Sequence, residues 1–288
     1  VPARQRCKSD HGRHSPQRPQ YSQGVFRTRH THEWRGGTQG VGAAIAECLA
    51  KAGCDVILHG LADDDFCKES LQLCRAHDVQ AEAVFQDLSL PSEQCIPQLL
   101  AQLPDPSEIA ILVNNAGTFY DKPFLEMDAA TFNRTMQLNV HAGYFLTQAF
   151  ARRWVAAGVA GRVLFTGSIN GVLAETDHTA YDSSKGAVHA MVRSLCVALA
   201  PSKIRVNAMA PGLVVTPLTA PVLSQDQQAM DWMKLHTPNR SVPGPEACAA
   251  AALFLLSDEA EHVQGQTLLV DGGMSIWQQP DLPDHFRT

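Results

Sequence analysis

Gly36-Gly37-Thr38-Gln39-Gly40-Val41-Gly42 is a glycine-rich turn that leads directly into a helix-period run. The run extends over residues 43–52 and carries Ile45 and Leu49 on one face. Glycine lets a backbone approach a ligand closely, and a helix N-terminus presents N–H groups with a partial positive charge. The stretch therefore predicts a phosphate-binding turn at the start of an α/β unit, although the same pattern also precedes ordinary helices.

Strand-like and helix-like runs alternate along the rest of the chain, which is typical of a parallel sheet covered on both faces. Ligands of such sheets bind beyond the carboxyl ends of the strands. We predict helices over 40–52, 64–77, 92–103, 128–157 (broken near its start), 178–200 and 245–257, and strands over 54–59, 81–86, 109–114, 162–167, 203–209 and 266–270.

Polar and glycine-containing motifs follow several of these predicted strands. They are Asn114-Asn115-Ala116-Gly117, Ser168 after Phe165-Thr166-Gly167, and Pro211-Gly212, with Asn139 inside the long helical run. Their positions predict one functional site at the carboxyl edge of the sheet.

Tyr181 and Lys185 lie four residues apart, and Ser168 lies thirteen positions before Tyr181. In a helix, residues i and i+4 share a face, so the ammonium of Lys185 is expected beside the phenol. A neighbouring cation favours phenolate, and we expect it to lower the tyrosine pKa from about 10. The pair then predicts proton transfer, although the spacing alone is common on exposed helices.

Together these motifs resemble the short-chain dehydrogenase/reductase family over residues 35–277. The resemblance implies a single doubly wound parallel sheet, a Rossmann fold, and hydride transfer between a nicotinamide cofactor and a secondary alcohol or ketone. It implies that Ser168, Tyr181, Lys185 and Asn139 are catalytic. It implies cofactor contacts from Gly36, Gly40, Val41, Gly42, Asp87, Leu88, Asn114, Ala116, Gly117, Tyr181, Lys185, Pro211, Gly212, Val214 and Thr216.

Cofactor and substrate are less clearly specified. Gly60 stands where an acidic residue at the end of the second strand would mark NAD, but Asp63, Asp64 and Asp65 follow and would repel a 2′-phosphate. We expect NAD, with NADP possible, and the aspartates also suit the start of a helix. The segment 231–239 resembles bacterial sugar and polyol dehydrogenases, whereas Gly60-Leu61 also resembles hydroxybutyrate and oxoacyl reductases.

The composition fits one large domain. The chain has 288 residues, 45% of them hydrophobic, and its formal net charge of −6 argues against general nucleic-acid affinity. The apolar run 247–256 is helix-sized and falls short of the roughly 20 residues that span a membrane. The eight cysteines form no Cys-x-x-Cys pair, so we expect free thiols in a reducing cytoplasm and no metal site. The family resemblance also implies a homo-oligomer, a dimer or tetramer.

Residues 1–34 do not fit the fold. They contain six Arg, one Lys, four His and three Pro against two acids, where relatives place an apolar strand. They can be interpreted as a disordered basic arm, as a transit peptide, or as a misassembled start that replaced the first strand. The abrupt change at Arg35-Gly36 favours the third interpretation, and residues 278–288 are expected to form a tail.

A missing first strand would leave sheet edges unpaired and a cavity in the core, which costs several kcal/mol of a total of about 5–15. The alternative function is therefore an impaired, non-catalytic binding protein. Cofactor binding separates the two hypotheses.

Overall fold

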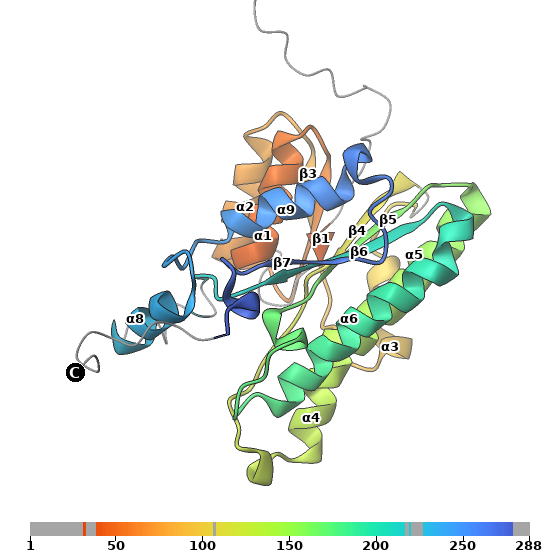
Figure 1. The fold of residues 1–288 in the computed structure, drawn as a ribbon. Helices are drawn as coiled ribbons and strands as arrows, with labels where there is room; N and C mark the ends of the chain where they lie inside the picture. Colours follow the sequence, from red (N-terminus) through yellow and green to blue (C-terminus); the bar gives the residue numbers. More distant parts are fainter. Residues whose placement is uncertain (1–30, 33–38, 106–107, 217–218, 220–226, 279–288) are drawn as a thin grey trace, which may run out of the picture.

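The fold is a parallel sheet with helices on both faces, as Figure 1 shows. The computed structural model describes residues 31–32, 39–105, 108–216, 219 and 227–278. Seven parallel strands lie in the order β3-β2-β1-β4-β5-β6-β7. The strands are β1 (Thr31–His32), β2 (Val56–Gly60), β3 (Ala81–Phe85), β4 (Ile111–Asn114), β5 (Arg162–Thr166), β6 (Arg205–Pro211) and β7 (Thr267–Val270). The order reverses at β1, so the predicted doubly wound sheet is confirmed.

The helices divide between the two faces of the sheet (Figure 1). α1 (Gly40–Lys51), α2 (Asp65–Arg75) and α9 (Glu246–Leu256) pack on one face. α3 (Ser92–Leu100), α5 (Ala142–Ala157) and α6 (Thr179–Leu199) pack on the other. Every residue of β2 and of β4 is buried, which explains their continuous apolar runs. None of the described helices has the length and apolar character needed to cross a membrane.

The prediction that residues 1–34 lack the first strand of the sheet is corrected by the structure. The strand is not absent: Thr31–His32 lies between β2 and β4 and pairs in parallel with both. It contains two residues, whereas β2 has five and β4 has four. Because His32 is opposite both His59 and Asn114, this short strand meets its neighbours near their carboxyl ends.

The predicted break in the helical run 128–157 is confirmed. α4 (Ala129–Met136) is followed by a π-helical turn, η3 (Gln137–His141), and then by α5. A π-turn inserts one extra residue per turn and often occurs at functional sites. Here it carries Asn139, whose side chain is buried at the edge of the sheet.

Candidate active site

The carboxyl ends of β4 and β5 bring four of the predicted residues to one edge of the sheet. Asn114 ends β4 and donates from Nδ2 to Thr147 Oγ1 at 3.0 Å, which ties α5 to the central sheet. The segment after it carries Ala116 and Gly117, and Ser168 comes two residues after the end of β5.

Ser168 is the N-cap of the short helix η4 (Ile169–Gly171). Its Oγ accepts a hydrogen bond from the Asn170 N–H at 3.1 Å and lies 3.3 Å from Asn170 Oδ1. The side chain is 7% exposed, so this cap fixes the direction of a nearly buried hydroxyl. Asn170 therefore fixes the orientation of Ser168, and the sequence motif did not single it out.

Tyr181 and Lys185 lie on one face of α6, as their spacing predicts. The Lys185 Nζ lies 5.5 Å from the centroid of the Tyr181 ring and donates to the Thr166 carbonyl at 2.9 Å. The ammonium is 4% exposed, and its burial lowers the lysine pKa to about 8. A buried cation thus faces the ring from one side.

The expected lowering of the tyrosine pKa is wrong for this structure. Burial raises the Tyr181 pKa to about 12, and the carboxylates of Glu175 and Asp182 add to the rise, whereas a hydrogen bond with Ser168 lowers it. Desolvation disfavours phenolate more than the polar neighbours favour it. The phenol therefore holds its proton at neutral pH and is set to donate it.

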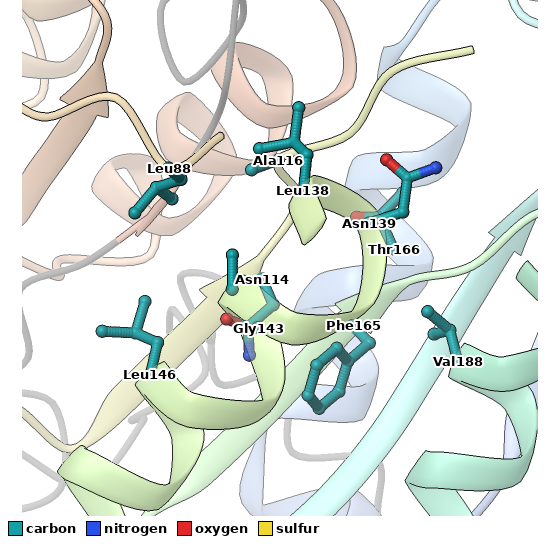
Figure 2. A pocket seen from close by; sticks show the side chains of 11 residues that line it. Leu88, Asn114, Ala116, Leu138, Asn139, Gly143, Leu146, Phe165, Thr166 and Val188 are labelled. Atoms are coloured by element: carbon teal, nitrogen blue, oxygen red, sulfur yellow. The ribbon is translucent and has the colours of Figure 1, made fainter. Parts of the chain in front are cut away.

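Asn139 is held by three hydrogen bonds. Its Oδ1 accepts from the Thr118 N–H at 2.8 Å, and its Nδ2 donates to the Thr118 carbonyl and to Ser184 Oγ, both at 2.9 Å. A cavity of about 10 Å³ lies beside it, lined also by Asn114 and Thr166 (Figure 2). A space of this size accommodates about one water next to polar side chains.

Two of the three glycines predicted to contact the cofactor from the glycine-rich turn lie in the first turn of α1. Gly40 has a φ of +59°, which favours glycine, and Gly42 is buried against the core. The N-cap residue Gln39 makes no side-chain cap, and the first turn carries no acidic residue. A helix N-terminus of this kind carries a partial positive charge that suits an anion. Gly36, the third glycine, lies outside the described residues.

The remaining predicted cofactor residues lie on the loops that follow β3 and β6. Asp87 accepts from the Ser89 N–H at 2.8 Å, and Leu88 is buried at the wall of the small cavity. Pro211 ends β6, and Gly212 donates from N to Val270 O at 3.0 Å. Val214 packs in the same core cluster as residues of α1 and α9, and Thr216 Oγ1 contacts Thr219 Oγ1 at 3.2 Å.

The end of β2 carries no charge for reading a ribose. His59 is buried and contacts the Gln86 carbonyl through Nε2 at 2.7 Å, and Gly60 ends the strand. Of the aspartates beyond it, Asp64 caps α2 through the Cys67 N–H, and Asp65 pairs with Lys68 at 3.3 Å. The interpretation of these aspartates as a helix start is thus confirmed for Asp64.

The residues at this edge fit a dinucleotide. A Cβ at Gly117 would lie 3.3 Å from Asn139 Oδ1 and 3.7 Å from Lys185 Nζ, so glycine keeps this surface open. The ammonium of the buried Lys185 has three N–H donors, and among the described residues it uses one of them, in the hydrogen bond to the Thr166 carbonyl. A ribose hydroxyl can accept from the others, while the α1 N-terminus suits the pyrophosphate.

Several polar residues around this site were not predicted from sequence. Asn170 contacts Ser168, and Glu175 and Asp182 contact Asn170, while His178 is the N-cap residue of α6. They cluster because the segment between η4 and α6 folds back on itself. No spacing rule links such residues, so only their three-dimensional contacts identify them.

Comparison with known proteins agrees with this geometry. A family model described as enoyl-(acyl carrier protein) reductase matches residues 36–275. The chain is 31% identical over 242 residues to an L-rhamnose 1-dehydrogenase (NAD(P)(+)) of Sphingomonas sp. (strain SKA58), covering 84% of this chain and 94% of that one. It is 33% identical over 246 residues to a galactitol 2-dehydrogenase (L-tagatose-forming) of Cereibacter sphaeroides, covering 84% and 93%.

A solved structure of similar fold carries a bound cofactor. It is a candidate 2-deoxy-D-gluconate 3-dehydrogenase from Agrobacterium tumefaciens with bound NADP, with a TM-score of 0.79 and 28% identity. The match covers 88% of this chain and 98% of that one. The chain therefore belongs to the short-chain dehydrogenase/reductase family of NAD(P)-dependent oxidoreductases.

Proposed function

We propose that this chain interconverts a secondary alcohol and a ketone on a sugar or polyol, with Ser168, Tyr181, Lys185 and Asn139 as its catalytic residues. The observation that carries the proposal is the position of Tyr181. Its phenol is hydrogen-bonded to Ser168 on one side, and its ring lies 5.5 Å from the buried Lys185 ammonium on the other. The relatives that act on rhamnose and galactitol support a polyhydroxylated substrate.

The cofactor, when bound, supplies or accepts the hydride; the protein supplies position and proton transfer. Ser168 is fixed by Asn170 and holds the substrate oxygen by a hydrogen bond. Tyr181 gives its proton to that oxygen in reduction and takes it back in oxidation. Lys185 holds a ribose hydroxyl, and Asn139 borders the cavity through which a water can restore the proton.

In its neutral state Tyr181 holds the proton that reduction requires. With a pKa near 12, the phenol is a proton donor over the whole neutral range. Oxidation requires phenolate, and we expect its rate to rise with pH until the tyrosine titrates. A substrate panel of neutral sugars and their keto forms, followed by absorbance of reduced nicotinamide, tests the function. Absence of turnover with every sugar and polyol would reject it.

We further propose NAD as the preferred cofactor. Asp63, Asp64 and Asp65 follow β2, and their carboxylates would repel a 2′-phosphate. No Lys or Arg stands at positions 59–62 to bind that phosphate instead. The ratio of kcat/KM for NAD to that for NADP measures the preference, and a ratio below one would overturn it.

The protein is proposed to act as a homo-oligomer in the cytoplasm. Tyr144, Phe145 and Val155 expose apolar surface on α5, and Val197 does so on α6, which supports contact with a second copy. All seven cysteines of the described part of the chain are free thiols, as suits a reducing compartment. Sedimentation of the purified protein distinguishes a dimer or tetramer from a monomer.

A further inference from the structure

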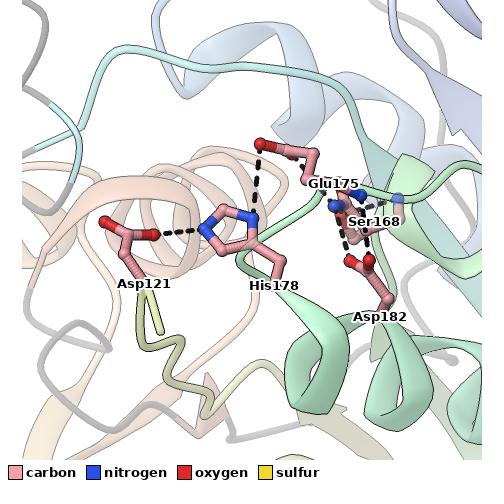
Figure 3. Close-up of polar contacts among 6 residues, drawn as sticks. Asp121, Ser168, Glu175, His178 and Asp182 are labelled. Atoms are coloured by element: carbon pink, nitrogen blue, oxygen red, sulfur yellow. Dashed lines mark hydrogen bonds and ion pairs between the residues drawn. The ribbon is translucent and has the colours of Figure 1, made fainter. Parts of the chain in front are cut away.

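His178 lies between two carboxylates at the side of the active site (Figure 3). Its Nε2 pairs with Asp121 on the segment that follows β4, and its Nδ1 lies 3.3 Å from Glu175 Oε2. Both ring nitrogens face a carboxylate, so the charged, doubly protonated ring can pair with both: Nε2 is hydrogen-bonded to Asp121, and Nδ1 makes an ion pair with Glu175. The imidazolium thus joins two segments that are far apart in the sequence.

Glu175 connects this pair to the candidate catalytic serine. Its Oε1 accepts from Asn170 Nδ2 at 3.0 Å, and Asn170 donates its backbone N–H to Ser168 Oγ. Asp182 also holds Asn170 and Glu175 in place. Its carboxylate accepts from Asn170 Nδ2 at 2.8 Å and from the Glu175 N–H at 3.0 Å. Any movement of Glu175 is therefore passed to Asn170 and on to the serine hydroxyl.

Few other charged groups face the His178 ring. The aromatic rings of Phe119 and Tyr181 pack edge-on to it, with centroids at 5.4 and 5.9 Å. The nearby Lys122 donates its backbone N–H to the Asp177 carbonyl, but its ammonium is paired with Asp128. The groups that decide the protonation of His178 are therefore Asp121 and Glu175, with Tyr181 neutral.

We propose that protonated His178 is a positioning residue that, with Asp121 and Glu175, clasps the two segments beside the substrate pocket and thereby fixes Ser168. The proposal rests on the proposed function of Ser168. It extends that function by one residue, His178, which acts in its protonated state and is not one of the four proposed catalytic residues.

The clasp has a defined pH range. The Glu175 carboxylate beside Nδ1 raises the His178 pKa from 6.5 to about 9, and Asp121 adds to the rise, against the opposing effect of burial. Because the folded-state pKa is raised, the stabilisation is complete below pH 6.5 and is lost as pH rises through about 9. At neutral pH the clasp is closed.

Titration of the histidine ring protons by NMR tests the clasp without any turnover. The His178→Gln variant identifies the resonance, and we expect a midpoint near 9 in the wild-type protein. Glu175→Gln and Asp121→Asn should each lower that midpoint by about one unit or more, since each removes an adjacent opposite charge. A wild-type midpoint near the ordinary value of 6.5, or one that neither variant changes, would overturn the proposal.

Kinetics then test whether the clasp positions the serine. We expect His178→Gln to lower kcat/KM at pH 7 by about 10- to 100-fold, because small displacements of a reacting group have effects of that size. The difference from the wild type should shrink above pH 9, where the wild-type ring also loses its proton. Glu175→Gln combined with His178→Gln should be little worse than either alone.

His77→Gln is the matched control. His77 is also paired with a carboxylate, Glu47 at 3.7 Å, but it lies after α2, away from the site. The His77→Gln substitution should therefore leave kcat/KM unchanged. If His178→Gln has no effect, or if its effect is the same at every pH, the clasp does not position Ser168. If the wild type turns over no substrate while the NMR titration behaves as expected, the proposed function fails and the clasp stands.

Discussion

Gly171→Ala is expected to displace the segment that carries Ser168, because the space for a side chain is already filled. Gly171 ends η4, and a Cβ built on it would lie 2.2 Å from Cε1 and 2.4 Å from Nδ1 of His189. His189 belongs to α6, and its ring is 6% exposed, so it cannot swing into solvent without moving its neighbours. Either the ring or η4 has to give way.

The size of the effect follows from these distances. Carbon atoms pack at about 3.5 Å or more, so the new methyl group requires a shift of roughly 1 Å. Overpacking of this kind costs about 1–3 kcal/mol in unfolding free energy. A shift of about 1 Å at Ser168 would reduce kcat/KM by about 100-fold. We therefore expect Gly171→Ala to lose both stability and activity.

A second substitution tests whether the ring is the obstacle. His189→Ala removes the ring and leaves a cavity, which alone should cost about 2–5 kcal/mol, although Nε2 has no hydrogen-bond partner among the described residues. In the double variant the methyl group added at position 171 enters the vacated space, so the two effects should be coupled by about 1 kcal/mol or more. The coupling is measured from the urea unfolding free energy and kcat/KM of four proteins: the wild type, Gly171→Ala, His189→Ala and the double variant.

Gly186→Ala provides the control on the same helix. No described residue lies within 4 Å of a Cβ at this position, so the substitution should stabilise α6 by about 0.5–1 kcal/mol and leave activity intact. If the Gly171→Ala and His189→Ala effects simply add, the ring does not fill the space at Gly171, and the argument fails.

Three further predictions address the proposed site and the first strand. Tyr181→Phe keeps the ring but removes the proton donor, so turnover should fall by about 10²–10⁴-fold with little change in melting temperature; more than a tenth of wild-type activity would refute the role. Lys185 has a pKa near 8, so we expect kcat/KM for reduction by the wild type to fall above that pH as the ammonium that holds the cofactor loses its proton. In Lys185→Met this fall should vanish and the KM for the cofactor should be higher at every pH. An unchanged pH profile would contradict this. Replacing residues 29–35 by an apolar strand ending in Thr should raise the melting temperature and its shift with NAD, and no gain in either would mean that the existing segment suffices.

The sequence predicts the regular elements well because their signals are local. β2 and β4 are continuous apolar runs, and both proved buried along their whole length. The break before α5 was also expected, although its form, a π-turn that buries Asn139, was not. Its geometry depends on hydrogen bonds to Thr118 and Ser184, which lie 21 and 45 residues away in sequence.

The electrostatics of the site could not be predicted in the same way. The spacing of Tyr181 and Lys185 correctly predicts a shared helix face, but the tyrosine pKa depends on burial and on Glu175 and Asp182. Likewise, nothing in the sequence links Asp121 to His178 across 57 positions. Short-range patterns identify which residues meet on one element, whereas pKa values depend on what other elements place around them.

The short first strand affects the two halves of the site unequally. Within the described residues, β1 pairs with β2 at Thr31 and His32 and with β4 opposite Asn114. Ser168, Tyr181 and Lys185 instead depend on β5, η4 and α6. Weak pairing at β1 should therefore reduce cofactor affinity first, while the geometry of the proposed proton-transfer group is preserved. A variant with a lengthened β1 would then lower the KM for the cofactor and leave the KM for the alcohol or ketone nearly unchanged.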